Sequence, residues 1–497
     1  MARIVRARVG AGAWRILPRM DAAPHLTIAT PPAADLPATL ERLRTAWLAN
    51  KPGLEQRRAD LGRLRHVLSR RLEAMDAAIR ADFGHRSTHE NLISEAMVTL
   101  SEIDLARRKL RRWAKPRRVG VGWKFWPARA EIRPLPVGVV GIISPWNYPV
   151  NLALVPLVSA IAAGNHVYLK PSEHTPRTSE FLRDLLAEVF PADRVAVAIG
   201  GADVGAAFSA LPFDHLLFTG STAVGRKVMA AAAPNLTPVT LELGGKAPAV
   251  VAPDFPLDLA AARIASGKWF NAGQTCIGVD YALVDVARRD AFVAALRAQV
   301  QARFGDFADA SNYTRIINAG QFDRLQGYVD DARARGCTVV PLVEVAPERM
   351  RAERLFPPTL VLDPPDDSAV MRNEIFGPLL PVRTYARLDE ALAYIGTHDR
   401  PLALYPFSND TRTVERIIGS TLAGGVTVND TLVHFAVDGL PFGGSGPSGM
   451  GAIHGRTGFD TFSKLLPVFR QTRWAATDLL RPPYKGYVDR LVRFLAR

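Results

Sequence analysis

The run Val137-Gly138-Val139-Val140-Gly141-Ile142-Ile143 decides the fold, because it predicts a buried strand at the start of a long αβ series. A helical pattern follows at 152–163, and a second apolar run at 167–169 predicts the next strand. The series continues with helices expected at 179–190 and from residue 223, and with strands expected at 195–198, 215–219 and 239–243. Strands that alternate with helices are typical of a parallel, doubly wound sheet, which binds ligands at the carboxyl ends of its strands.

Two further kinds of region flank this series. Residues 36–114 carry leucines at spacings of three and four, which predicts helices, and the Pro-, Gly- and Trp-rich stretch 115–135 predicts a protruding β-hairpin. Strands expected near 248–252, 281–285 and 426–428 predict a second domain of similar design. The predicted fold class is therefore α/β, with two doubly wound αβ domains plus a β-hairpin or bridging element.

The composition is that of a globular protein. The 497 residues are 48% hydrophobic and 22% charged, so disorder is not expected, and the length predicts two or three domains. No apolar run reaches the roughly 18 to 20 residues of a membrane span, and the arginine-containing N-terminus has no continuous apolar segment typical of a signal peptide. Two cysteines without a secretion signal predict a cytoplasmic location and exclude a disulfide framework.

The net charge of +14 raises nucleic acid or an anionic membrane as partners. A basic cluster runs through residues 107–118, but no nucleic-acid motif accompanies it, so we expect a solvated helix end and no nucleic-acid partner. The segment 484–497 has an amphipathic helical pattern. We expect it to dock on the body of the protein or on a second subunit, with peripheral membrane contact as the alternative.

Two residues stand in frames that indicate covalent chemistry. Cys276 ends Phe270-Asn271-Ala272-Gly273-Gln274-Thr275-Cys276, and Glu242 lies in Leu241-Glu242-Leu243-Gly244-Gly245-Lys246, 34 residues upstream. A thiol among small, turn-prone neighbours together with a separate carboxylate favours a nucleophile and its base. For Cys276 alone, a small buried hydrophobic residue is an equally good interpretation.

Other polar motifs follow predicted strands. The turn Gly220-Ser221-Thr222-Ala223-Val224-Gly225 opens a helix, where backbone N–H groups favour a phosphate, although such a turn needs glycine anyway. Lys170 and Glu173 could bind a ribose or pair with each other, and Asn147 could stabilise an oxyanion or only satisfy its own turn. Glu374, next to an aromatic residue, could hold a ribose or lie in a plain loop.

Together, seven motifs resemble those of the aldehyde dehydrogenase superfamily over residues 40–475. They are Pro-Trp-Asn-Tyr-Pro (145–149), Lys-Pro-Ser-Glu (170–173), Phe-Thr-Gly-Ser-Thr (218–222), Leu-Glu-Leu-Gly-Gly-Lys (241–246), Gly-Gln-Thr-Cys (273–276), Glu-Ile-Phe-Gly-Pro (374–378) and Pro-Phe-Gly-Gly (441–444). The C-terminal motifs at 446–463 resemble the class 3 branch, and within it the coniferyl aldehyde dehydrogenase group.

The resemblance implies catalytic roles. Cys276 would attack an aldehyde, and Asn147 with the Cys276 backbone N–H would hold the thiohemiacetal oxyanion. After hydride transfer, Glu242 would activate the water that hydrolyses the thioester to the carboxylic acid. The expected cofactor is NAD, with NADP also usable, and no metal is expected. The residues implied in cofactor binding are Lys170, Glu173, Gly220, Ser221, Gly225, Glu374, Phe376 and Trp146.

The resemblance also implies a homodimer and a substrate class of aromatic aldehydes, phenylpropenals or medium- to long-chain aliphatic aldehydes. Two other functions stay open: a CoA-acylating dehydrogenase, against which Glu242 argues, and a catalytically retired binding protein, against which the complete set of catalytic residues argues. The predicted segments are a flexible basic arm (1–30), an NAD(P)-binding domain (31–114 and 136–243), a catalytic domain (244–440), bridging and oligomerisation segments (115–135 and 441–480) and an amphipathic tail (481–497).

Overall fold

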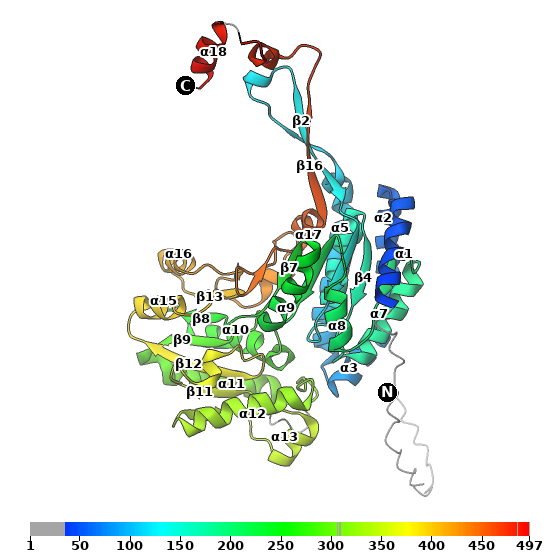
Figure 1. Cartoon of the computed structure of the whole chain (residues 1–497). Coiled ribbons are helices and arrows are strands. Elements are labelled where there is room, and N and C mark those ends of the chain that lie inside the picture. The colour runs from blue at the N-terminus through cyan, green and yellow to red at the C-terminus, as the bar shows by residue number, and fades with distance from the viewer. Residues whose placement is uncertain (1–34, 306, 308–309, 485, 497) are drawn as a thin grey trace, which may run out of the picture.

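The computed structural model describes residues 35–305, 307, 310–484 and 486–496 (Figure 1). The predicted N-terminal arm, residues 1–30, lies outside the described residues. Helices precede the first sheet as predicted; the first of them packs against its strands, and the others pack mainly on one another and on the helices that cover the sheet. The preceding helices are α1 (Asp35–Ala49), α2 (Leu54–Arg70), α3 (Leu72–Phe83), α4 (Thr88–Asn91), a π-helical turn (Leu92–Met97) and α5 (Val98–Ala114).

The first sheet has six strands, in the order β15-β7-β6-β3-β4-β5, and all pairs are parallel except β15 with β7. The strands are β3 (Val139–Ile143), β4 (His166–Lys170), β5 (Val195–Val197), β6 (His215–Thr219), β7 (Val239–Glu242) and β15 (Gly449–Met450). The connecting helices are α6 (Asn151–Ala163), α7 (Pro176–Val189), α8 (Ala202–Ser209) and α9 (Thr222–Ala232). This arrangement confirms the parallel, doubly wound prediction.

The opening run of the series forms the centre of this sheet. All five residues of β3 are buried, as expected for a strand that is covered by helices on both faces. Close packing explains the glycine at position 141, because a Cβ there would lie 2.7 Å from the ring of Phe213. Every residue of α6 is buried too, which explains why its sequence is apolar on all sides.

The second sheet has seven strands, in the order β10-β11-β12-β9-β8-β13-β14, with only β10 antiparallel to its neighbour. The strands are β8 (Pro248–Val251), β9 (Tyr281–Asp285), β10 (Thr338–Pro341), β11 (Thr359–Leu362), β12 (Leu379–Tyr385), β13 (Ala403–Phe407) and β14 (Gly425–Val426). The helices are α10 (Leu257–Trp269), α11 (Arg289–Phe304), α12 (Ala319–Ala334), α13 (Pro347–Glu353), α14 (Ala369–Arg372), α15 (Leu388–Gly396) and α16 (Thr411–Ser420). The three strands expected here are present as β8, β9 and β14, and β10 to β13 were not anticipated.

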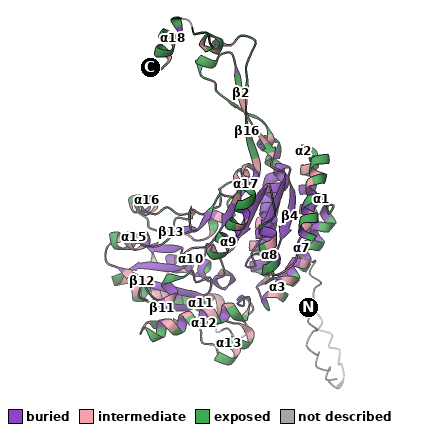
Figure 2. Ribbon diagram, in the orientation of Figure 1, coloured by how far each residue is buried: buried purple, intermediate pink, exposed green. Residues whose placement is uncertain are grey.

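The predicted hairpin is confirmed as a long arm that projects from the body, and most of its residues are exposed or half-buried (Figures 1 and 2). It consists of β1 (Arg117–Val119) and β2 (Arg129–Pro136), and β16 (Ser463–Arg470) pairs with β2 along all eight residues. Between β15 and β16, α17 (Gly455–Thr461) packs against α6, so the predicted segment 441–480 contributes to the first sheet as well as to the arm. The domain boundaries themselves stay a prediction.

The C-terminal tail forms the expected helix, α18 (Tyr487–Leu495). It lies at the tip of the arm, where the Lys124 Nζ donates to the Leu495 carbonyl, and away from the body (Figure 1). Val488 is buried, but Phe494 is 68% exposed, so part of the apolar face has no cover within the described chain. Every helix among the described residues is too short or too polar to cross a membrane.

The first part of the basic cluster, residues 107–112, lies on the last turns of α5, and the rest continues into β1. Arg107 pairs with Asp104, Arg108 with Asp438 and Arg111 with Glu55, all at exposed or half-exposed positions. These ion pairs fit the expected solvated helix end and leave less free positive charge than the sequence alone indicates.

Candidate active site

Cys276 follows a strained turn at the end of α10. Asn271, Ala272 and Gly273 all have positive φ (52°, 51° and 74°), a conformation that non-glycine residues seldom adopt and that surrounding contacts must impose. The side chain of Gln274 supplies two such contacts, because it donates to the Arg315 carbonyl at 3.1 Å and accepts from the Ile317 N–H at 3.0 Å. The polar residues before Cys276 therefore fix its backbone.

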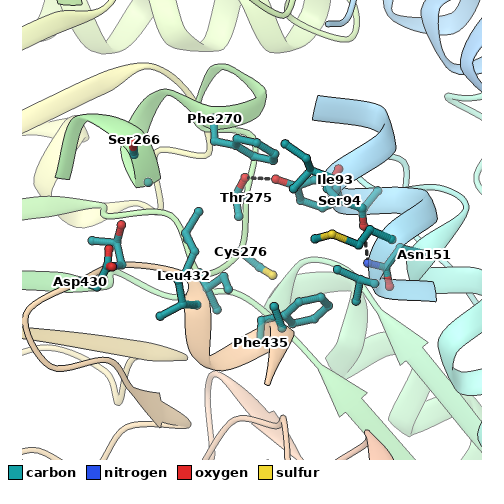
Figure 3. A pocket seen from close by; sticks show the side chains of 18 of the residues that line it. Ile93, Ser94, Asn151, Ser266, Phe270, Thr275, Cys276, Asp430, Leu432 and Phe435 are labelled. Carbon is teal, nitrogen blue, oxygen red and sulfur yellow. Dashed lines mark hydrogen bonds between the residues drawn. The ribbon is translucent and has the colours of Figure 1, made fainter. Parts of the chain in front are cut away.

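The thiol lies where two cavities meet. One is an apolar cavity of about 300 Å³, in which Phe270, Leu432 and Phe435 surround Cys276 (Figure 3). The other is a more polar cleft of about 640 Å³, which Cys276 lines together with Asn147 and Glu242. Groups bound in the two cavities would therefore both contact Cys276.

The surroundings keep the thiol protonated at neutral pH. Burial raises the pKa of Cys276 to about 12, and the carboxylates of Glu374 and Glu242 add to the rise. The nucleophilic form is the thiolate, so attack requires a group that removes the proton.

Glu242 lies at the end of β7 and lines the same cleft as Cys276. Its side chain is 2% exposed, and neither carboxylate oxygen has a hydrogen-bond partner among the described residues. Burial without compensating bonds raises the pKa of Glu242 well above its usual value. A carboxylate with a raised pKa is a better general base near neutral pH.

Asn147 lies in the loop after β3 and is 3% exposed. Its Nδ2 donates to the Gln274 carbonyl at 3.1 Å, which brings the amide next to the Cys276 turn. Its own carbonyl accepts from the Arg86 Nη1 and the Asn271 Nδ2, both at 3.0 Å. The predicted convergence of Asn147, Glu242 and Cys276 on one site is therefore present in the structure.

Sequence reasoning missed the buried ion pair that supports this loop. Arg86 and Glu95 are fully buried and pair at 3.1 Å. Glu95 also accepts from the N–H groups of Val150 and Asn151, at the start of α6. The only sequence signal was two charged residues in the polar stretch 85–95, and a surface position explains such charges equally well.

The polar cleft holds most of the predicted cofactor residues: Trp146, Gly220, Ser221, Glu374 and Phe376. The rings of Trp146 and Phe376 meet edge-on, with centroids 5.3 Å apart. Gly220 and Ser221 lie at the N-terminus of α9, which favours a phosphate. Glu374 is half-buried, its Oε1 is buried without a partner, and a Cβ on Gly244 would lie 1.9 Å from its Oε2. An aromatic wall, an anion-favouring turn and a carboxylate with an unpartnered oxygen fit a dinucleotide.

Three predicted cofactor residues do not line this cleft. Lys170 is buried and pairs with Glu173 at 2.9 Å outside the cleft lining, and the ribose contact of these two residues stays a prediction. Gly225 is covered by Leu243, and a Cβ there would lie 2.6 Å from the Leu243 side chain. The glycine thus lets α9 pack closely on the segment after β7 and does not face the cleft. Nowhere in the described chain do three acidic, histidine or cysteine side chains gather as a metal site.

Residues 23–467 match the model of the aldehyde dehydrogenase family. The chain is 50% identical to a probable coniferyl aldehyde dehydrogenase of Pseudomonas aeruginosa over 92% of this chain and 95% of the relative. It is 42% identical to the coniferyl aldehyde dehydrogenase of a Pseudomonas species (93% and 96%) and 40% identical to the rat aldehyde dehydrogenase family 3 member B1 (90% and 94%).

Solved structures give the same result. The substrate-bound state of Staphylococcus aureus AldH superposes with a TM-score of 0.88 at 36% identity, covering 93% of this chain and 99% of the other. The Mycobacterium tuberculosis aldehyde dehydrogenase complexed with NAD⁺ superposes with a TM-score of 0.80 at 27% identity, covering 89% and 91%.

Proposed function

The chain belongs to the aldehyde dehydrogenase family and is an NAD(P)-dependent oxidoreductase, and from this premise we propose which residues carry the reaction and which aldehydes it takes. The observation that carries the proposal is the position of Cys276, which lines both the apolar cavity and the polar cleft. An aldehyde enters through the apolar cavity, and the cofactor occupies the cleft on the other side of the sulfur.

Glu242 takes up the thiol proton, and the sulfur of Cys276 attacks the carbonyl carbon to form a thiohemiacetal. The Asn147 amide, which its bond to the Gln274 carbonyl holds in place, and the Cys276 backbone N–H stabilise the oxyanion. Loss of a hydride leaves a thioester on Cys276. Glu242 releases the thiol proton to solvent and then accepts a proton from water, which attacks the thioester, breaks its C–S bond and releases the carboxylic acid from Cys276.

Trp146, Phe376, Glu374 and the turn at Gly220 and Ser221 would hold NAD(P), which supplies the hydride acceptor when it is bound. We propose NAD as the preferred form, because the carboxylate of Glu173 disfavours a 2′-phosphate, while Lys170 would still allow NADP. The cytoplasmic location stays a prediction.

We propose a phenylpropenal such as coniferyl aldehyde, or another aromatic or medium- to long-chain aldehyde, as the substrate. Support comes from the apolar walls around Cys276, which suit a flat ring or an alkyl chain, and from the names of the 50% and 42% identical relatives.

Coniferyl aldehyde is expected to have a kcat/KM at least about tenfold above that of acetaldehyde, because burial of an aromatic ring adds binding energy that a methyl group lacks. Initial NADH formation measured over a panel of aldehydes with NAD and NADP checks this. Equal values for both aldehydes would contradict the substrate class. Each reaction is repeated with CoA, and acyl-CoA as the main product would overturn the hydrolytic reaction in favour of CoA acylation.

We also propose a homodimer in which the arm extends the sheet of a second copy. The outer edge of β16 supports this, since Leu465, Leu466 and Phe469 are 38%, 37% and 52% exposed there and an open apolar edge favours strand pairing.

Leu466→Lys is expected to convert a two-chain particle into a single chain, because it places a charge on that edge. Light scattering coupled to gel filtration gives the mass. Leu48→Lys, at an exposed leucine of α1 far from the arm, is the matched control and should stay dimeric. A wild-type mass of one chain would contradict the dimer, and co-sedimentation of such a monomer with anionic vesicles would favour the membrane alternative for the tail.

A further inference from the structure

A buried ion pair between Lys246 and Asp280 lies next to the catalytic residues but takes no part in the steps above. Lys246 is four residues after Glu242, and Asp280 is four residues after Cys276. Their side chains are 9% and 5% exposed. An ion pair that is this deeply buried is stabilised only when its remaining donors and acceptors are satisfied.

Both partners are satisfied by the loop that carries Glu374. The Lys246 Nζ donates to Asp280 and also to the carbonyls of Val370 and Asn373, both at 2.9 Å, so its three N–H donors are all used. The second carboxylate oxygen of Asp280 accepts from the Ile375 N–H at 2.9 Å. The pair thereby ties together the segments after Glu242, after Cys276 and around Glu374.

These contacts hold the backbone on both sides of Glu374. The residue before Glu374 is held by Lys246 through its carbonyl, and the residue after Glu374 is held by Asp280 through its N–H. With the backbone fixed on both sides, the Glu374 side chain has one direction in which to leave the loop, and it lies in the polar cleft. Neither charged group has a free donor or a free oxygen for a substrate, so neither is placed as a catalytic residue.

We propose that Lys246 and Asp280 form a positioning pair that holds the Glu374 carboxylate where it binds the cofactor ribose, and so set the affinity for NAD rather than the affinity for the aldehyde. This inference rests on the proposed cofactor role of Glu374. Loss of either partner would release one side of the loop and leave the other partner as an unpaired buried charge.

The same geometry predicts that the pair affects how NAD affinity depends on pH. Burial and then the nearby Asp280 raise the pKa of Glu374 to about 8, while Lys246 and Arg324 oppose the rise. Other titratable groups near Glu374 are Lys268 and Cys276, whose ionisation Glu374 influences, and Glu242, which lines the same cleft. An ionised carboxylate accepts hydrogen bonds from ribose hydroxyls better than a protonated one, so NAD affinity should increase as the pH rises through the Glu374 pKa. Replacing Asp280 by neutral Asn should move that increase to lower pH.

Calorimetric titration of NAD into the purified protein, without aldehyde, tests the proposal. Lys246→Met and Asp280→Asn are each expected to raise the Kd for NAD about tenfold or more, because small displacements of a binding group have large effects. Lys246→Arg keeps the charge and should recover part of the affinity. The KM for the aldehyde at saturating NAD should stay within about twofold of wild type, since the apolar cavity does not include the pair.

Asp60→Asn is the matched control, because it breaks another buried ion pair, with Arg194, far from the cleft. It should lower the Tm as much as Asp280→Asn does, with the Kd for NAD unchanged. An unchanged Kd in folded Lys246→Met and Asp280→Asn, or a pH profile of Asp280→Asn that coincides with wild type, would overturn the proposal. Failure of the wild-type protein to bind NAD would instead count against the proposed cofactor site, so the two failures are distinct.

Discussion

Cys276→Ala is expected to reduce aldehyde-dependent NADH formation by about 10⁴-fold or more, because removal of a nucleophile eliminates the covalent route altogether. The structure gives no substitute for this thiol. Cys276 is the one cysteine that lines both cavities, and the second cysteine of the chain, Cys337, lies in the loop between α12 and β10.

Cys337→Ala is the matched control and should turn over at the wild-type rate. NADH absorbance gives the rates, and titration with NAD checks that Cys276→Ala still binds the cofactor, which separates a lost nucleophile from a lost fold. Turnover by Cys276→Ala at the wild-type rate would end the proposal that this residue carries the acyl group.

The predictions that succeeded rest on local patterns. The apolar run at 137–143 has to be buried on both sides, and the helix-strand alternation after it leaves few topologies other than a parallel sheet. Ligands of such sheets bind at the carboxyl ends of the strands, so Asn147 after β3 and Glu242 at the end of β7 were expected near each other. Cys276 reaches the same site from the segment that precedes β9 of the second sheet. The order of the motifs indicated this position, whereas the hydrophobic periodicity did not.

The residues that sequence reasoning missed act through contacts between distant segments. Arg86 and Glu95 matter because they meet the loop of Asn147, which is 61 positions away from Arg86. Lys246 was quoted within a motif, yet its partners at 280, 370 and 373 come together only when the second sheet is assembled. No local pattern distinguishes such a lysine from a solvated one.

The cofactor roles predicted for Gly225, Lys170 and Glu173 stay predictions, because none of the three residues lines the cleft in the structure. Each fits a motif whose implied role is cofactor binding, but the glycine is covered by Leu243, and the two charges pair with each other outside the cleft. A motif gives the residue type and the neighbouring element, whereas the direction of a side chain depends on what packs beside it. Glycine in particular serves close packing and ligand approach equally well.

Glu242→Gln is expected to stop the reaction at the thioester, with one NADH released per active site and a later steady rate about 10² to 10⁴ times slower than wild type. The amide has the shape of the carboxylate but cannot accept a proton, so water is no longer activated. The first turnover also slows, since Glu242 takes the thiol proton of Cys276 as well. The test therefore depends on the amplitude of the NADH burst and not on its rate.

Stopped-flow NADH absorbance measures the burst, and hydroxylamine tests what remains on the enzyme. Hydroxylamine attacks a thioester without a general base, so it should release the acyl group as a hydroxamate and restore turnover. Glu180→Gln makes the same chemical change on α7, in an exposed ion pair with Arg177, and should behave as wild type. A steady rate equal to wild type in Glu242→Gln would contradict the assignment of the base.

The pH dependence separates the base from a merely structural carboxylate. Burial raises the pKa of Glu242 well above its usual value, and only its deprotonated form accepts a proton. The steady rate of the wild-type enzyme should therefore rise with pH through that raised pKa and fall as the pH drops below it. Glu242→Gln has no such group, so its residual rate should lose this rise. If the residual rate of Glu242→Gln kept the pH profile of the wild-type enzyme, the residue that titrates and activates water would be another one.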